Sequence, residues 1–146
     1  MKRQLSEQAQ AAKQIKTILK KAFPKTKFRV VSDSFAGGDS VNIRWEDGPT
    51  DDAVRELTHQ YQEGHFNGME DIYEYSNDRD DIPQAKYVLR QRDLSVGAQM
   101  AKKTELVAFY GIKDPESDAE WREKTGEWPN HVINRELRNE TIYPDA

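Results

Sequence analysis

Residues that could bind a metal or act as catalytic bases are few and scattered in this chain. His59 and His65 lie on either side of an expected helix end, and His131 lies far along the sequence. The chain contains no Cys, and no tight set of carboxylates completes a zinc-type site around any histidine. We therefore interpret all three as ordinary surface or partly packed histidines, unless the fold brings them together. The sequence predicts no metal centre and no cofactor.

Catalytic motifs are missing as well. The sequence contains no G-x-S-x-G nucleophile, no Cys/His pair, no phosphoryl-transfer loop and no dinucleotide-binding glycine pattern. Adjacent carboxylates such as Glu70 and Asp71 would point to opposite faces of a strand, which suits paired acid and base work poorly. The acidic run at residues 77–81 lacks the glycine and the closing glutamate of a calcium loop. We expect a protein that is not an enzyme; an enzyme whose site assembles only in space is the weakest alternative.

Cationic side chains on one expected strand are the most prominent charge feature. Because successive side chains of a strand point to opposite faces, Lys86, Arg90 and Arg92 would lie on one face of the strand expected at residues 84–92. If Arg44 shares this face, the sheet presents a basic strip near tyrosines, an arrangement that can hold single-stranded nucleic acid. The competing interpretation, which we favour, is a solvated sheet face whose cations pair with the plentiful acidic residues.

Two tryptophans near the C-terminus, Trp121 and Trp128, are further candidate binding residues. Large aromatic side chains serve either as core anchors or as the central residues of a partner surface. We favour the core for both, and keep both as candidates beside the four cations. The lysines of the first expected helix are interpreted as a solvated helix face rather than a phosphate-binding stripe: Lys13, Lys16, Lys20 and Lys21.

Length and composition indicate one soluble domain, with or without a helical extension. The 146 residues are 36% hydrophobic and 33% charged, enough for a modest core. The net charge of −4 is smaller in magnitude than a protein mimic of nucleic acid would carry. It is also negative, whereas a protein that binds DNA through its overall charge is positive. The start of the chain lacks a signal-peptide core, and no apolar run reaches the roughly 18 residues of a membrane span. We expect no membrane association and a cytoplasmic location.

Local patterns define the elements that would position these residues. Helical spacing, strand alternation and capping residues predict a helix at 6–22, strands at 27–32 and 41–45, a helix at 50–62, strands at 72–75 and 84–92, and helices beginning after Ser95, Ser117 and Trp128. The glycine-rich segment between the first two strands suits a hairpin. We therefore predict an α+β domain with a small antiparallel sheet, in the order α-β-β-α-β-β, over residues 1–95. Residues 96–146 would form a helical extension packed on it.

Four motifs allow a family resemblance to be named: Phe23-Pro24, SFAGGDS at residues 34–40, W-x-DGP at 45–49 and GHFNGMEDIYEY at 64–75. Over about residues 10 to 95 the chain resembles the large polyvalent protein-associated domains, the twenty-ninth of that numbered series. Such domains occur in phages and conjugative elements, alone or inside giant proteins that accompany incoming DNA. The resemblance implies a mobile-element protein acting in a bacterial cytoplasm, and it carries over no catalytic residues.

From these observations we predict a small, non-enzymatic accessory protein that inhibits a host defence component, such as a CRISPR effector. It would occupy a protein surface through the helical extension or an exposed sheet edge. The alternative is a nucleic-acid-binding accessory protein that uses the basic sheet face. The two differ in salt dependence, because phosphate contacts weaken steeply as salt rises. The oligomeric state stays open.

Overall fold

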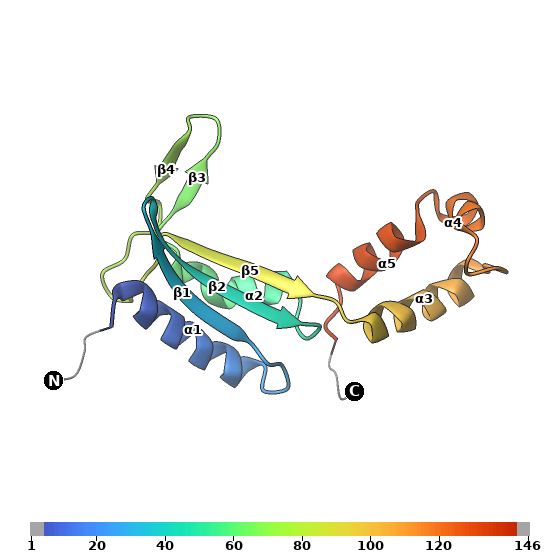
Figure 1. Ribbon diagram of the computed structural model, residues 1–146, viewed down its shortest axis with the longest axis horizontal. Helices are drawn as coiled ribbons and strands as arrows, with labels where there is room; N and C mark the ends of the chain where they lie inside the picture. Colours follow the sequence, from blue (N-terminus) through green and yellow to red (C-terminus); the bar gives the residue numbers. More distant parts are fainter. Residues whose placement is uncertain (1–4, 143–146) are drawn as a thin grey trace.

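The computed structural model describes residues 5–142, and it shows an α+β part followed by a helical part (Figure 1). In chain order the elements are α1 (Glu7–Ala22), β1 (Arg29–Phe35), β2 (Gly38–Glu46), α2 (Asp51–Thr58), the short 3-10 helix η1 (His59–Tyr61), β3 (His65–Asn67), β4 (Ile72–Glu74), β5 (Tyr87–Asp93), α3 (Val96–Tyr110), α4 (Asp118–Thr125) and α5 (Pro129–Arg138). The predicted α+β class with a C-terminal helical part is confirmed.

The main sheet has three strands in the order β1-β2-β5. The predicted hairpin of β1 and β2 is antiparallel, with a two-residue turn at Ala36 and Gly37. β5 runs parallel to β2, with Trp45 beside Arg92. A parallel neighbour needs a long crossover, and here α2 and the β3–β4 ribbon return the chain to the start of β2. β3, a strand that was not predicted, pairs with β4 in a separate antiparallel ribbon.

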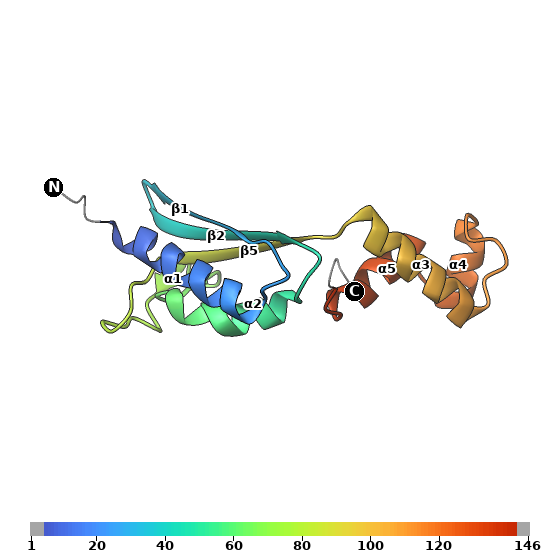
Figure 2. The same cartoon turned by 90° about the horizontal axis from the view of Figure 1, so that it is seen from below.

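Helices α1 and α2 cover one face of the main sheet, and the other face carries no helix (Figure 2). The predicted alternation of β2 is confirmed, because Val41, Ile43 and Trp45 are buried while Asn42 and Arg44 are exposed. The buried side chains of the sheet pack on both helices in the first hydrophobic cluster, whose members from the helices include Ala11, Ile15, Leu19 and Val54. A sheet with one covered face leaves its second face available for binding.

The N-terminal ends of the helices follow the predicted capping chemistry. Thr50, Ser95 and Ser117 each accept a hydrogen bond from a backbone N–H three residues on. Helix α3 ends at Gly111, whose φ of 65° is readily adopted by glycine. A second hydrophobic cluster fills the helical part, with Trp121 fully buried at its centre.

The helical part extends away from the end of β5, beyond the sheet (Figure 1). Polar contacts connect the two parts where β5 runs into α3. Asp47 in the turn after β2 accepts hydrogen bonds from the backbone N–H and the hydroxyl of Ser95. Gly48 forms an isolated antiparallel bridge with Ile142. The segment after α5 therefore returns at Ile142 to the turn that follows β2.

Candidate functional site

A groove lined by cationic side chains runs between α1 and the edge strand β1. We call it the basic groove, and it encloses about 760 Å³. Six cationic residues line it, and no acidic residue does: Lys16, Lys20, Lys25, Lys27, Arg29 and Arg44. The remaining lining is largely apolar, with Pro24, Phe28 and Val30 among its members. Such a surface selects for anions.

Three elements, α1, β1 and β2, and the connection between α1 and β1 bring these cations together. Lys16 and Lys20 lie one helical turn apart on α1, so they share a helix face. Lys25 and Lys27 come from the connection that follows Pro24, where the helix has ended. Arg29 of β1 is the direct cross-strand partner of Arg44 of β2.

The Arg29–Arg44 pair does not contribute to the stability of the sheet. Like charges placed directly opposite each other on antiparallel strands destabilise the sheet. Lys16, Lys20, Lys27 and Arg29 form no salt bridge with any residue in the range 5–142. Arg44 donates to Asp93 Oδ2 at 2.8 Å, but both side chains are well exposed to water. Solvated ion pairs of this kind exchange readily for other partners.

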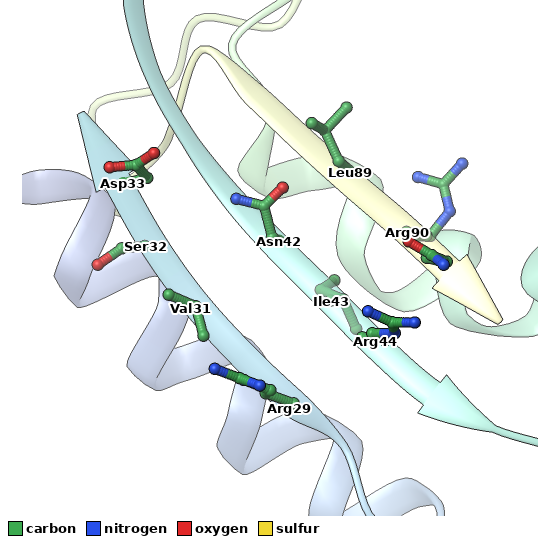
Figure 3. Close-up of a pocket in the computed structure, with 10 residues that line it drawn as sticks. Arg29, Val31, Ser32, Asp33, Asn42, Ile43, Arg44, Leu89 and Arg90 are labelled. Atoms are coloured by element: carbon green, nitrogen blue, oxygen red, sulfur yellow. The ribbon is translucent and has the colours of Figure 1, made fainter. Parts of the chain in front are cut away.

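The uncovered face of the main sheet adjoins the basic groove. Its centre is a shallow hollow of about 490 Å³ between the three strands, shown in Figure 3. Val31, Asn42 and Leu89 form one row across the three strands. Val31 and Leu89 are 44% and 53% exposed, so this face offers apolar contact area to a ligand. Arg29 and Arg44 line both the hollow and the basic groove.

An aromatic pair closes the opposite end of this face. The rings of Phe35 and Tyr87 stack with centroids 6.2 Å apart and planes inclined by 24°. Phe35 is 47% exposed. Tyr87 also makes an edge-to-face contact with the ring of Tyr73. Burial is the main cause that raises the pKa of Tyr73 to about 12. The open face therefore carries cations at one end and aromatic rings at the other. We call the whole surface, from Arg29 to Phe35, the open sheet face.

The conditional prediction of one basic strip is wrong. In the parallel register Arg90 lies beside Ile43 and Arg92 lies beside Trp45, so both arginines are on the helix-covered face. Arg44 points from the opposite face, because adjacent strand residues alternate. The sequence pattern of β5 alone could not reveal this, since a strand's alternation does not say which face of the sheet is covered.

Lys86, which immediately precedes β5, and the two arginines of β5 instead contact the protein itself. Arg90 donates to Asp51 Oδ1 at 3.1 Å, at the start of α2. Lys86 Nζ donates to the Gly37 carbonyl at 2.8 Å and lies 5.0 Å from the ring centre of Tyr73. Arg92 donates to four backbone carbonyls, those of Asp47, Gly48, Leu137 and Glu140. Burial lowers the pKa of the Arg92 guanidinium.

The two candidate tryptophans differ in exposure. Trp121 is fully buried, and its indole N–H donates to the Pro115 carbonyl at 2.9 Å. A partner could therefore reach it only if the helical part opened. Trp128 is 46% exposed and lies 4.7 Å beneath the guanidinium of Arg122. Trp128 is the tryptophan that offers surface to a partner.

The three histidines lie on separate elements. His59 begins η1, His65 begins β3 and His131 lies in α5. His65 pairs with Glu74 of β4 at 3.1 Å. Within residues 5–142 no group of three or more His, Asp or Glu side chains is placed to hold a metal ion.

Sequence reasoning considered the lysines of α1 but did not connect them with Lys27, Arg29 and Arg44, although a signal for the basic groove exists. Between Glu7 and Asp33 the chain contains seven Lys or Arg residues and no acidic residue. This local excess is hidden by the overall charge of −4. Its recognition required counting charge by segment rather than over the whole chain.

Fold and surface together define a small α+β protein with an open three-stranded sheet and an adjoining cationic groove. The family model for large polyvalent protein associated domain 29 matches residues 6–100, which is well over half of the chain. The chain belongs to this family, and is thus a domain of the phage and mobile-element associated kind that the resemblance implied. The match spans α1 to the start of α3, so it includes both the basic groove and the open sheet face.

Comparison with curated proteins and with solved structures finds no match for the chain. Within residues 5–142, no helix is both long enough and apolar enough to cross a membrane.

Proposed function

We propose that this protein is a nucleic-acid-binding accessory protein of a phage or another mobile element, and that its basic groove binds the phosphate backbone. The observation that carries the proposal is the lining of the groove: six cationic side chains and no acidic one. The alternative function predicted from the sequence was nucleic-acid binding by Arg44, Lys86, Arg90 and Arg92. The proposal here assigns this binding to the residues of the basic groove, of which only Arg44 was among the predicted four.

The chemistry of the lining fits phosphate in two ways. Arg29 and Arg44 present planar forks that can donate two parallel hydrogen bonds to a phosphate. Lys16, Lys20 and Lys27 are exposed point charges on flexible stems, able to follow a backbone of variable path. Binding would release the counterions that the phosphates hold, which favours association at low salt. Arg44 would exchange its exposed contact with Asp93 for a phosphate oxygen.

The test is fluorescence anisotropy of a labelled oligonucleotide, measured over a range of salt concentrations. The double variant Lys20→Gln with Lys27→Gln should bind more weakly. It should also reduce the magnitude of the log–log salt slope by about 1.4 for a single strand, since two contacts of about 0.7 each are lost. The matched control, Lys113→Gln with Lys124→Gln, removes two exposed lysines from the helical part and should bind like the unaltered protein. If both double variants lost the same affinity for the oligonucleotide, binding at the basic groove would be refuted.

The second candidate function is inhibition of a host defence component by the helical part. It is supported by apolar side chains exposed there, with Phe109 at 77% and Trp128 at 46%. Both residues lie beyond the family match, which ends at residue 100. A surface of this kind suits a partner particular to this protein, because exposed aromatic side chains are frequent anchors of protein interfaces.

A pulldown from bacterial lysate separates the two functions. The inhibitor hypothesis expects one defined defence protein that survives nuclease treatment and high salt, and that is lost with Phe109→Ala and Trp128→Ala. The nucleic-acid hypothesis expects recovery that nuclease abolishes and that Lys20→Gln with Lys27→Gln reduces. A partner that survives nuclease but ignores both aromatic changes would contradict the assignment to the helical part.

A further inference from the structure

We infer that the nucleic acid bound is single-stranded, with its phosphates in the basic groove and its bases lying on the open sheet face. The inference rests on the proposed function and adds the ligand class and its path. The two surfaces are continuous, because Arg29 and Arg44 line both of them. A chain anchored by phosphate at these arginines is therefore positioned beside the exposed row of Val31, Asn42 and Leu89 (Figure 3).

The apolar character of that row favours unpaired bases. In a duplex the flat faces of the bases are stacked on one another, so only their edges and the backbone meet a protein. An unpaired strand exposes these faces, and single-strand binders combine a cationic groove with side chains on which the bases stack. Val31 and Leu89, half-exposed on the open sheet face, would have no comparable contact with a duplex.

Phe35 supplies the stacking position. It lies on β1 in the same alternation as Arg29 and Val31, six residues along the strand from Arg29. At about 3.3 Å per residue this separation is about 20 Å. Its ring is supported by Tyr87 and remains 47% exposed, so one base can stack on the outer side. Some RNA-binding sheets likewise stack two or three bases on exposed aromatic side chains.

Polar groups along the path set its limits. Asn42 Nδ2 donates to Ser40 Oγ at 3.0 Å, which leaves the amide oxygen of Asn42 as an acceptor for a base edge. Asp33 and Asp93 lie on the same face of the sheet, near its β1 and β5 margins. Asp33 disfavours phosphates at its position on the β1 edge. Asp93 lies at the opposite end, where it contacts Arg44 Nε at 2.8 Å, so a phosphate bound at Arg44 would displace this carboxylate.

The test compares a labelled oligothymidine with a duplex of the same length in anisotropy titrations at equal salt. We expect the single strand to bind more tightly. Phe35→Ala should weaken single-strand binding about tenfold or more, the range for one lost base stack, and leave the salt slope unchanged. Phe109→Ala, which removes a more exposed Phe from α3, is the control and should bind normally. Leu89→Asn tests the same face without altering the aromatic pair.

Photo-crosslinking gives an independent readout. An oligonucleotide carrying a halogenated uracil should form adducts at Phe35 or Tyr87, identified by mass spectrometry of the digested protein. Adducts confined to α1 would overturn the inference.

The failures of the two proposals are distinguishable. No binding of either nucleic acid, or binding insensitive to Lys20→Gln with Lys27→Gln, refutes the proposed function. A different set of results would keep the proposed function and refute the single-strand inference. In that case the single strand and the duplex bind with equal affinity, the double lysine variant binds more weakly, and Phe35→Ala and Leu89→Asn bind as tightly as the unaltered protein.

Discussion

Arg92 Nη1 donates a hydrogen bond to the backbone carbonyl of Leu137 at 2.8 Å, which joins the end of β5 to the end of α5. The same guanidinium also reaches the carbonyls of Asp47, Gly48 and Glu140. One side chain thus contacts the turn after β2 and the last turn of the chain's helical part. A residue that sequence analysis considered for ligand binding is instead a connection between the two parts of the protein.

Replacement of Arg92 should therefore loosen the helical part. Arg92→Ala removes the donor for four carbonyls, and we expect a loss of about 2–3 kcal/mol of unfolding free energy, as for hydrogen bonds to charged groups. Arg92→Lys should restore little, since an ammonium cannot present a planar fork. Urea unfolding measures the loss, and hydrogen exchange should rise near Leu137. Arg44→Gln, on the exposed face, is the control and should leave stability nearly unchanged. If the two variants were equally stable, the connecting role would be wrong.

The side chain of Asp47 should be nearly as important for the start of α3. Its carboxylate accepts from the Ser95 N–H at 2.9 Å and the Ser95 hydroxyl at 2.6 Å, and Ser95 in turn caps the helix. Asp47→Ala should cost about 1–3 kcal/mol by leaving these donors without an acceptor. Asp47→Asn should cost less, because Asn keeps one acceptor and tolerates the φ of 55° found here. Chemical unfolding of both variants checks the order, and equal losses would contradict it.

Gly64 should tolerate no side chain. A Cβ at this position would lie 1.8 Å from the Glu74 carbonyl oxygen, where β3 begins its pairing with β4. We expect Gly64→Ala to destabilise by about 1–3 kcal/mol, as overpacking does, with the β3–β4 ribbon most affected. Gly68→Ala lies in the same ribbon with no atom within 4 Å of its added Cβ, so it is the matched control. Thermal unfolding and amide exchange of the ribbon would show a difference between the two; its absence would refute the steric account.

The pKa of Asp93 should depend on Arg44. The hydrogen bond from Arg44 lowers the pKa of the Asp93 carboxyl below its ordinary value. Because the folded-state pKa is depressed, the pair stabilises the protein at neutral pH, and this contribution is lost as the pH falls through the folded-state pKa. Arg44→Gln should raise the pKa of Asp93 toward the ordinary range. A carboxyl-detected NMR titration measures it, and an unchanged value would disprove the assigned cause.

The predicted boundary between residues 95 and 96 stays a prediction. Each part has its own hydrophobic cluster, while Arg92 and Asp47 carry polar contacts across the junction. The family match ends at residue 100, a few residues into α3.

What the sequence determined by itself was local. The caps at Thr50, Ser95 and Ser117, the alternation of β2 and the hairpin that precedes it each depend on residues a few positions apart. Such features are fixed by hydrogen bonds and periodicity within one segment, so they can be recognised without knowing the rest of the fold. The family motifs were recognisable for a related reason, since each is a short continuous segment of the chain.

The tertiary structure decided which faces and which distant residues come together. The parallel pairing of β5 placed Arg90 and Arg92 on the covered face, although Arg44 belongs to the open one. The packing of α1 along β1 brought Lys16 and Lys20 beside Arg29, and so created the basic groove. These outcomes follow from contacts between segments far apart in the chain. No local period encodes such contacts, because hydrophobic packing of the whole domain selects the pairing.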